Sequence, residues 1–274
     1  MKKDIFNGKV AIVTGGASGI GQALVEKMAS MGTIAIIADV DITKGEKLAS
    51  RLVAEGKQAF FHKLDVSNEE EVYQLVSNVS SQFGRLDFMF NNAGISSMSE
   101  FDDITSQQWK KIIDINLLGV VYGSTAAYKV MKEQGHGYIV NTSSAAAFGP
   151  APLSSSYGTT KHAVLSLTTS LHYEAMDYGV KVSAVCPAFV TTPIMETMEI
   201  SNFDREVFTK NAKNYISSEK CAEIILKGIE KEELIITTIG LRKTTSVLFT
   251  IFPGLQRKLM KLVVQTGRKA RIQE

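Results

Sequence analysis

Tyr157 and Lys161 form the pair in this sequence whose residue types and spacing most directly suggest chemistry. They lie four residues apart in SYGTTKHAV, so on an α-helix they share one face, one turn apart. A phenol has an ordinary pKa of about 10, and a nearby ammonium stabilises the phenolate and lowers that pKa. Such a pair can exchange a proton with an alcohol or carbonyl oxygen. The spacing also occurs by chance on many helices, but here the pair follows a predicted strand and the serines Ser143 and Ser144, which favours a site.

A glycine-rich loop near the start of the chain is the second candidate. An apolar run from Val10 to Val13 ends at Thr14, and a segment with helical periodicity follows the glycines at positions 15, 16, 19 and 21. Strand, tight turn and helix in this order are typical of a nucleotide-binding unit, where bare glycine backbone leaves room for a pyrophosphate. The helix N-terminus offers N–H groups and a positive dipole end to the phosphates. Because glycines near a helix start can also mark a simple turn, the loop needs support from elsewhere.

Asp39 provides that support. It follows the second apolar run and lies 18 residues after Gly21. This is close to the spacing of about 20 at which a carboxylate meets the adenosine ribose 2′-OH. A carboxylate there repels a 2′-phosphate, and no Arg or Lys stands at Ser18 or Val40 to neutralise one. We therefore expect NAD rather than NADP as the cofactor, with Lys44, the nearest cation, on the solvated face of the next helix.

The order of predicted elements indicates an α/β fold. Apolar segments of strand length alternate with helical patterns, and the strands are expected at 10–14, 34–38, 58–63, 86–91, 137–142, 180–185 and 234–238. Strands with continuous apolar character are typical of a parallel sheet covered on both faces, so we predict a single doubly wound parallel sheet with helices on both faces. Ligands of such sheets bind at the carboxyl ends of the strands. The residues at those ends are Thr14, Asp39, Asp65, Asn91, Ser144 and Pro187.

Helical patterns fill the intervals between the strands. Ser67 with Glu70, and Thr105 with Gln108, are predicted to form capping boxes at two helix starts. The pattern over 109–131 predicts one long helix. The other helices are expected at 42–55, 67–82, 155–178 and 218–230.

Composition bounds the class of protein. With 274 residues, 45% hydrophobic and 21% charged, the chain can bury a sizeable core as one large domain. Cys186 and Cys221 lie in apolar contexts, so buried thiols in a reducing compartment are expected. The first residues lack the apolar segment of a signal peptide, which predicts a cytoplasmic location. The four histidines have no ligand-like spacing, so no metal is expected.

The charge of the chain is concentrated at one end. Residues 241–274 contain eight Lys or Arg against one acid, so this tail carries +7 and the remainder −5. A mildly acidic body argues against nucleic acid as a ligand. Steps of 100° from residue 254 to 265 separate an apolar from a basic side, namely Leu255, Leu259, Leu262 and Val263 from Arg257, Lys258 and Lys261. Such a helix can lie on an anionic membrane surface, or its apolar side can cover the substrate pocket or a neighbouring subunit; both interpretations stay open.

Together these motifs resemble the short-chain dehydrogenase/reductase family, in its branch with a Tyr-x-x-x-Lys active site. The resemblance covers about residues 7–240 and is carried by Thr14-Gly15-Gly16-Ala17-Ser18-Gly19-Ile20-Gly21, Asn91-Asn92-Ala93-Gly94, Asn116, the serine pair, and Tyr157 with Lys161. It implies a Rossmann fold and an oxidoreductase that transfers a hydride between a nicotinamide and a secondary alcohol or ketone.

The resemblance also implies a role for each matching residue. Tyr157 is expected to be the general acid/base, Lys161 to lower its pKa and hold the nicotinamide ribose, and Ser144, rather than Ser143, to steady the substrate. Asn116 is expected to hold a water that links Lys161 to solvent. The expected cofactor-binding residues are Gly15, Ser18, Gly19, Ile20, Gly21, Asp39, Asp65, Val66, Asn91, Ala93, Gly94, Tyr157, Lys161, Pro187, Val190 and Thr192.

One departure from the family pattern follows the sixth strand, where Pro187-Ala188 replaces the usual Pro-Gly. The methyl group of Ala188 narrows the allowed backbone, but Val190 and Thr192 still match the positions that hold the carboxamide, so cofactor binding is expected to persist. We expect one domain over 1–240, including a substrate lid at about 190–215. The basic tail then spans 241–274.

Partners and substrate are predicted less directly. The two long helices resemble those through which this family forms homodimers and homotetramers. If the tail binds a membrane, a lipophilic substrate of the sterol, retinoid or long-chain alcohol type is favoured. Specificity is expected in the loops 94–104, 145–156 and 190–215. The alternatives are an NADP(H)-dependent carbonyl reductase and a non-catalytic NAD-binding regulator, and the presence of both Tyr157 and Lys161 favours an enzyme.

Overall fold

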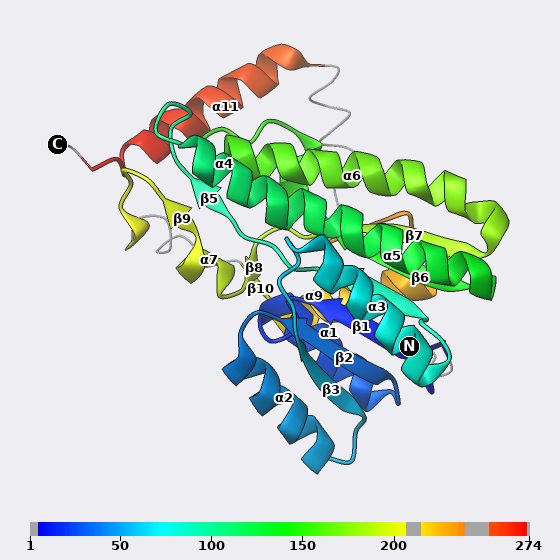
Figure 1. The fold of residues 1–274 in the computed structure, drawn as a ribbon. Coiled ribbons are helices and arrows are strands. Elements are labelled where there is room, and N and C mark those ends of the chain that lie inside the picture. Colours follow the sequence, from blue (N-terminus) through cyan, green and yellow to red (C-terminus); the bar gives the residue numbers. More distant parts are fainter. Residues whose placement is uncertain (1–4, 207–214, 239–251, 273–274) are drawn as a thin grey trace.

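A seven-stranded parallel sheet forms the centre of the computed structural model, which describes residues 5–206, 215–238 and 252–272 (Figure 1). The strand order is β11-β7-β6-β4-β1-β2-β3. The bounds are β1 (Val10–Thr14), β2 (Ile34–Asp39), β3 (Ala59–Lys63), β4 (Phe88–Asn91), β6 (Gly137–Thr142), β7 (Val180–Cys186) and β11 (Ile235–Thr237). Chain order runs outward from β1 on one side and from β4 on the other, so the switch point for ligand binding lies at the carboxyl ends of these two strands.

Helices cover both faces of the sheet. Leu24, Leu52 and Ile225 bring α1, α2 and α9 into the hydrophobic core on one face, and Val76 and Ala127 bring α3 and α5 into the core on the other. The bounds are α1 (Gly19–Ser30), α2 (Ile42–Ala54), α3 (Glu69–Phe83), α4 (Ser106–Ile113), α5 (Gly119–Gln134), α6 (Ser155–Ala175), α9 (Ser218–Glu230) and α11 (Pro253–Arg268). The predicted doubly wound Rossmann fold is therefore confirmed.

The long helix predicted over 109–131 is interrupted. Its start is as expected, because the Thr105 hydroxyl accepts a hydrogen bond from the backbone N–H of Gln108 (3.2 Å) and the capping box is complete. However, α4 ends in a π-helical turn, Asp114–Leu118, before α5 begins at Gly119. A single extra residue in a helical turn leaves apolar spacing almost unchanged, so the sequence pattern did not show it. Such turns occur frequently at functional sites.

The second predicted capping box does not form. Asn68, not Ser67, caps α3, and its side-chain oxygen accepts from the backbone N–H of Glu71 at 3.3 Å. Ser67 instead donates its hydroxyl to the carboxylate of Asp65 at 2.7 Å. The prediction of a capping box at Ser67 and Glu70 was wrong because the Asp65 carboxylate, two residues earlier, competes for the Ser67 hydroxyl.

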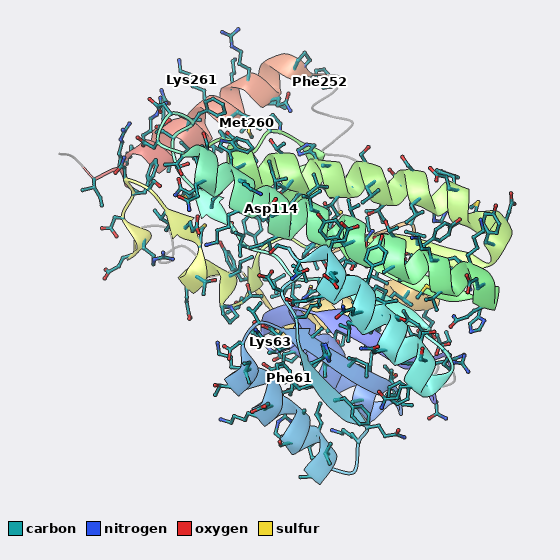
Figure 2. The ribbon with its side chains drawn as sticks, viewed as in Figure 1. Phe61, Lys63, Asp114, Phe252, Met260 and Lys261 are labelled. Carbon is teal, nitrogen blue, oxygen red and sulfur yellow. The ribbon has the colours of Figure 1, made fainter. Side chains whose placement is uncertain are left out.

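Short elements connect the lid to the rest of the chain. β5 (Ser97–Met98) pairs with β9 (Glu199–Ile200), and β8 (Val190–Thr191) pairs with β10 (Ile216–Ser217). Residues 207–214 of the predicted lid and 241–251 of the predicted tail lie outside the described residues. From Pro253 the tail forms the expected helix, α11; Figure 2 labels Phe252, just before it, and Met260 and Lys261 on it. Among the described helices, none combines the length and apolar character that a membrane span needs.

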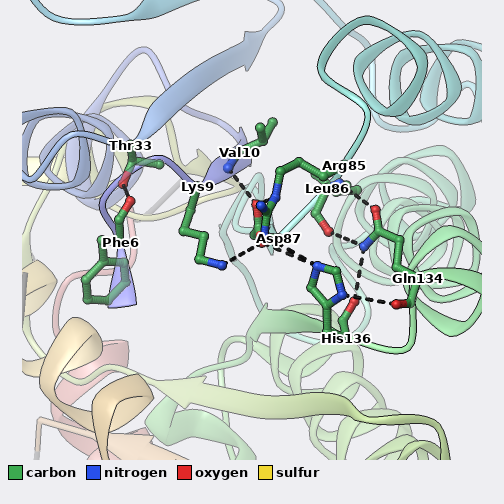
Figure 3. Close-up of polar contacts among 9 residues, drawn as sticks. All are labelled: Phe6, Lys9, Val10, Thr33, Arg85, Leu86, Asp87, Gln134 and His136. Atoms are coloured by element: carbon green, nitrogen blue, oxygen red, sulfur yellow. Dashed lines mark hydrogen bonds and ion pairs between the residues drawn. The ribbon is translucent and has the colours of Figure 1, made fainter. Parts of the chain in front are cut away.

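A cluster of charged side chains lies at the amino-terminal edge of the sheet (Figure 3). The buried carboxylate of Asp87 accepts from the backbone N–H of Val10 (2.9 Å) and from Arg85 Nε (2.7 Å), with Lys9 Nζ at 3.4 Å and His136 Nε2 at 3.7 Å. Burial raises the pKa of Asp87, but Arg85, the Val10 N–H and Lys9 together outweigh it and hold that pKa below its ordinary value. The cluster ties the start of β1 to the segment that leads into β4.

Candidate active site

The glycine loop after β1 can exist only because certain positions lack a side chain. Gly15 has a φ of +62°, and a Cβ there would lie 2.9 Å from the Cα of Ala93. A Cβ on Gly21 would lie 2.1 Å from the carbonyl oxygen of Gly15. Ser18, the N-cap residue of α1, makes no side-chain cap hydrogen bond. The N–H groups of the first turn can therefore donate to another acceptor. These features fit a pyrophosphate lying against the loop.

Thr14, the last residue of β1, joins this loop to the Asn-Asn-Ala-Gly motif after β4. Its hydroxyl accepts from the backbone N–H groups of Asn92 (2.9 Å) and Ala93 (3.0 Å) and donates to the carbonyl of Phe90 (3.2 Å). The Asn92 amide also donates to the Thr14 carbonyl at 3.0 Å. The two predicted cofactor segments are therefore one hydrogen-bonded unit at the switch point.

The Asp39 carboxylate is held at the end of β2 next to the glycine loop. One oxygen accepts from the backbone N–H of Ala17 and the other from that of Asp41, each at 3.0 Å. Each carboxylate oxygen has a further lone pair, so the group can still accept from a ribose hydroxyl. The geometry thus fixes a negative charge beside the loop, as the sequence predicts.

Asp65 and Val66, two of the predicted cofactor-binding residues, follow β3. The Asp65 carboxylate accepts from the backbone N–H of Ser67 at 2.9 Å as well as from its hydroxyl, so one of its oxygens is already engaged. Val66 is buried, and a Cβ on Gly119 at the start of α5 would lie 2.9 Å from its side chain. Both residues therefore lie at the carboxyl edge of the sheet, with Val66 packed under α5.

The side chain of Asn91 lies in a buried polar network. Its side-chain amide donates to Asn141 Oδ1 (2.8 Å) and Ser124 Oγ (3.1 Å), within a buried network between β4, β6 and α5. Thr168 of α6 joins the network by accepting from the Asn141 amide at 3.1 Å. The Asn91 side chain thus links β4 to β6 and α5, and its backbone continues into the predicted cofactor motif.

Lys161 and Tyr157 share one face of α6, as the spacing predicts. Lys161 is 3% exposed, its Nζ donates to the carbonyl of Thr142 at 2.9 Å, and it lies 5.7 Å from the centroid of the Tyr157 ring. Burial lowers the pKa of Lys161 to about 8. Burial raises the pKa of Tyr157, against a lowering by its hydrogen bond with Ser144. This direction is opposite to the one expected from spacing alone, because both groups are withdrawn from water.

The two serines after β6 differ in what they contact. The Ser143 hydroxyl donates to the backbone carbonyl of Lys161 at 2.7 Å and is buried against α6. Ser144 instead reaches the Tyr157 phenol and accepts from the backbone N–H of Ala146 at 3.1 Å. The arrangement therefore leaves Ser144, not Ser143, beside the phenol.

Asn116 lies in the π-helical turn, and its side chain contacts the loop after β4. Its amide oxygen accepts from the Ile95 N–H (2.8 Å), and its amide nitrogen donates to the Ile95 carbonyl (2.9 Å) and the Thr160 hydroxyl (3.3 Å). The point where a Cβ on Gly94 would stand is 3.1 Å from Asn116 Oδ1 and 3.4 Å from Lys161 Nζ. Because Gly94 has no side chain, its backbone can lie close to both the Asn116 amide and the Lys161 ammonium.

The segment after β7 lies against the glycine loop. The Pro187 carbonyl accepts from the N–H of Ala145 at 2.9 Å, which ties it to the serine pair. Val190 belongs to β8, and a Cβ on Gly19 would lie 3.3 Å from the Cβ of Thr192. The segment after β7 and the glycine loop after β1 therefore meet at the N-terminus of α1.

Three groups beside the predicted site residues had no signal in the sequence. These are the Thr142 carbonyl that accepts from Lys161, the Thr160 hydroxyl that accepts from Asn116, and Cys186, which interacts electrostatically with both Tyr157 and Lys161. Backbone acceptors carry no residue signature, and a cysteine at a strand end looks like core. Within the part of the chain that the structure describes, no group of three His, Cys, Asp or Glu side chains could hold a metal ion.

A doubly wound sheet with a glycine loop, an acidic residue after β2 and a Tyr–Lys–Ser cluster defines a nicotinamide-dependent class of oxidoreductase. Residues 9–202 match the family described as short chain dehydrogenase, and the chain belongs to this short-chain dehydrogenase/reductase family.

Named relatives support the assignment. The chain is 33% identical to levodione reductase of Leifsonia aquatica over 214 residues, 77% of this chain and 80% of the relative. It is 32% identical to cyclohexanol dehydrogenase of Acinetobacter sp. strain SE19 over 195 residues, 71% of this chain and 78% of the relative. A short-chain dehydrogenase/reductase from Burkholderia phymatum, solved in complex with NAD, superimposes with a TM-score of 0.84 and 29% identity, over 92% of this chain and 96% of that one.

Proposed function

We propose that the protein is an NAD(H)-dependent oxidoreductase that transfers a hydride between nicotinamide and a secondary alcohol or ketone. The observation that carries this proposal is the cluster of Tyr157, Lys161 and Ser144 at the carboxyl edge of the sheet. Relatives named for the reduction of levodione and the oxidation of cyclohexanol support the reaction class.

The choice of NAD rests on Asp39. Its fixed carboxylate would accept from the ribose 2′-OH and repel a 2′-phosphate, while the glycine loop and the N-terminus of α1 would hold the pyrophosphate. The NAD complex of the Burkholderia neighbour is consistent with this choice. When bound, the nicotinamide accepts or supplies the hydride; the protein aligns it and manages the proton.

Tyr157 carries that proton. Its raised pKa keeps the phenol neutral at pH 7, so it can donate to the oxygen of a bound ketone, and Ser144 can hydrogen-bond the same oxygen. With a pKa of about 8, Lys161 is still an ammonium at pH 7 and stabilises the phenolate left behind. A water held near Asn116 and Lys161, as the family resemblance implies, would return the proton from solvent.

Two sets of variants test the proposal. Tyr157→Phe should lose at least about a hundredfold in kcat while binding NADH normally in a fluorescence titration. Asp39→Ala should weaken NAD and improve NADP. Asp39→Asn is the matched control, because an amide oxygen can still accept from Ala17 but carries no charge. A wild type that prefers NADPH would refute the assignment of Asp39, and a fully active Tyr157→Phe would refute the mechanism.

We also propose that the substrate is lipophilic and that α11 contacts a membrane peripherally. The helix has three faces. It packs on the body through a strip that includes Gln256, Met260 and Gly267, whereas the predicted apolar side stays exposed, with relative exposures between 39% and 59%. The exposed apolar residues are Leu255, Leu259, Leu262 and Val263.

The basic residues of the helix favour a membrane surface that carries negative charge. Arg257, Lys258 and Lys261 are exposed, and 100° steps place them on the flank of the packed strip away from the leucines, so an anionic bilayer can take both the leucines and the cations. Leu259→Glu with Leu262→Glu should abolish sedimentation with vesicles containing phosphatidylserine. Dimerisation lost in the same variant, with vesicle binding absent in the parent, would show instead that a second copy covers this face.

We further propose a cytoplasmic homodimer or homotetramer. The two buried thiols, Cys186 and Cys221, fit a reducing compartment. Tyr173 and Met176, at the end of α6, are 66% and 57% exposed and offer apolar area for a subunit contact. Sedimentation velocity of the parent and of Tyr173→Glu tests this assembly.

A further inference from the structure

The residues at the end of α11 contact three separate loops. A Cβ on Gly267 would lie 2.3 Å from Leu153 Cδ1, so the helix meets the loop before α6 at the closest possible approach. Beyond the helix, the Ala270 carbonyl accepts from the N–H of Asp204 at 2.8 Å, and the Ile272 N–H donates to the carbonyl of Asn202 at 3.0 Å. The segment 267–272 is therefore bonded to both the α6 entry loop and the lid.

An ion pair fixes the same segment to the third loop. Arg268 donates from Nε to Glu100 Oε1 at 2.6 Å and from its terminal nitrogen to Oε2 at 3.0 Å. The Glu100 side chain is only 10% exposed, and Arg268 holds the pKa of its carboxyl below the ordinary value. A bidentate pair restricts orientation as well as distance, so it sets how the tail lies on the loop.

These loops lead to the catalytic tyrosine. The hydroxyls of Ser97 and Ser156 are 2.7 Å apart, and Ser156 is the residue before Tyr157. The N–H of Ser99 donates to the carbonyl of Leu153 at 2.9 Å. Leu153 is buried with a φ of +63°, a backbone strain that persists only where the surroundings enforce it.

The tail and the loops also share an apolar contact. Leu153, Phe203 and Ala270 form a buried cluster, and Met98 and Ile200 pack against it. These side chains come from all three loops, and Ala270 of the tail completes the cluster.

We infer that Glu100 and Arg268 are specificity-determining positioning residues, which lock segment 267–272 onto the loops beside Tyr157. The pair keeps the apolar side chains of these loops in the arrangement that receives a lipophilic alcohol or ketone. The inference rests on the proposed function and deepens it, because it assigns the tail to the substrate site. Neither residue touches the reacting atoms.

Charge reversal tests the pair. Arg268→Glu should raise KM for a long-chain secondary alcohol about tenfold, with kcat within about twofold and NADH affinity unchanged. The swapped variant Glu100→Arg with Arg268→Glu should recover most of the loss. Lys269→Glu is the matched control, since Lys269 is the next residue, is exposed and forms no ion pair within the described part of the chain.

Hydrogen exchange gives a readout that does not depend on turnover. Amides of residues 97–104 and 199–204 should exchange faster in Arg268→Glu, return toward the parent rate in the swap, and stay unchanged in Lys269→Glu. If Arg268→Glu does not fold, Arg268→Gln takes its place. Equal KM and equal exchange in Arg268→Glu and Lys269→Glu would overturn the inference, whereas a parent that binds NADH but oxidises no alcohol would refute the proposed function alone.

Discussion

Replacing Lys161 with Met should change how stability depends on pH. Burial lowers the pKa of Lys161 from 10.5 to about 8. Between these values the folded chain binds fewer protons than the unfolded chain, so stability rises with pH across that window and the buried charge is unfavourable below it. A shift of this size is worth about 3 kcal/mol, of which about 2.5 kcal/mol is regained between pH 7 and pH 10.

The Met variant keeps the length of the side chain and removes the charge. It also leaves the Thr142 carbonyl without the donor that stands 2.9 Å away, at a cost of about 1–3 kcal/mol. At pH 7 the relief of about 3 kcal/mol equals or exceeds this cost, so Lys161→Met should be as stable as the parent or up to about 2 kcal/mol more stable. At pH 10 the parent has regained about 2.5 kcal/mol, so the variant should be less stable than the parent by about 0.5–2.5 kcal/mol.

Guanidinium unfolding of both proteins at pH 7 and pH 10, without cofactor, measures this change. Lys47→Met, at an exposed position of α2, is the matched control for loss of a lysine and should show no comparable change. A stability difference between parent and Lys161→Met that stays constant across the two pH values would refute the argument, and with it the buried charge on which the mechanism depends.

The raised pKa of Tyr157 predicts that alcohol oxidation, which needs the phenolate, accelerates steadily from pH 7 to pH 9, as followed by reduced-cofactor absorbance; a flat profile would contradict this. Asp87→Asn should cost about 2–3 kcal/mol, since it leaves Arg85 without its buried partner. Because the folded pKa of Asp87 is lowered, that difference should shrink in acid denaturation as pH falls through it. Gly21→Ala should abolish NADH binding in a fluorescence titration, as its Cβ would lie 2.1 Å from the Gly15 carbonyl; unchanged affinity would disprove the constraint.

The sheet could be predicted from the sequence because each strand is an apolar run bounded by turn residues. β6 begins and ends at the predicted residues, 137 and 142, and β7 extends one residue beyond its predicted end. The residues at the carboxyl ends of strands could be predicted to converge because a parallel sheet brings those ends to one edge.

What the sequence could not show depends on contacts between distant segments. The π-helical turn at 114–118 is held by bonds from Asn116 to Ile95, and the pKa direction of Tyr157 depends on burial by neighbours that spacing does not reveal. The docking of Arg268 on Glu100 joins residues 168 positions apart, which no local pattern encodes.

The π-helical turn links the register of two helices. The turn takes up one residue more than a regular α-helical turn. Removing one residue from 114–118 would restore a regular α-helix and leave α5 facing the sheet, where Gly123 packs so closely that a Cβ would lie 1.9 Å from Asn91 Oδ1. A single-residue deletion in this turn should therefore keep the fold but move Asn116 away from the Ile95 backbone, so sequences of related proteins can be aligned with a one-residue gap here.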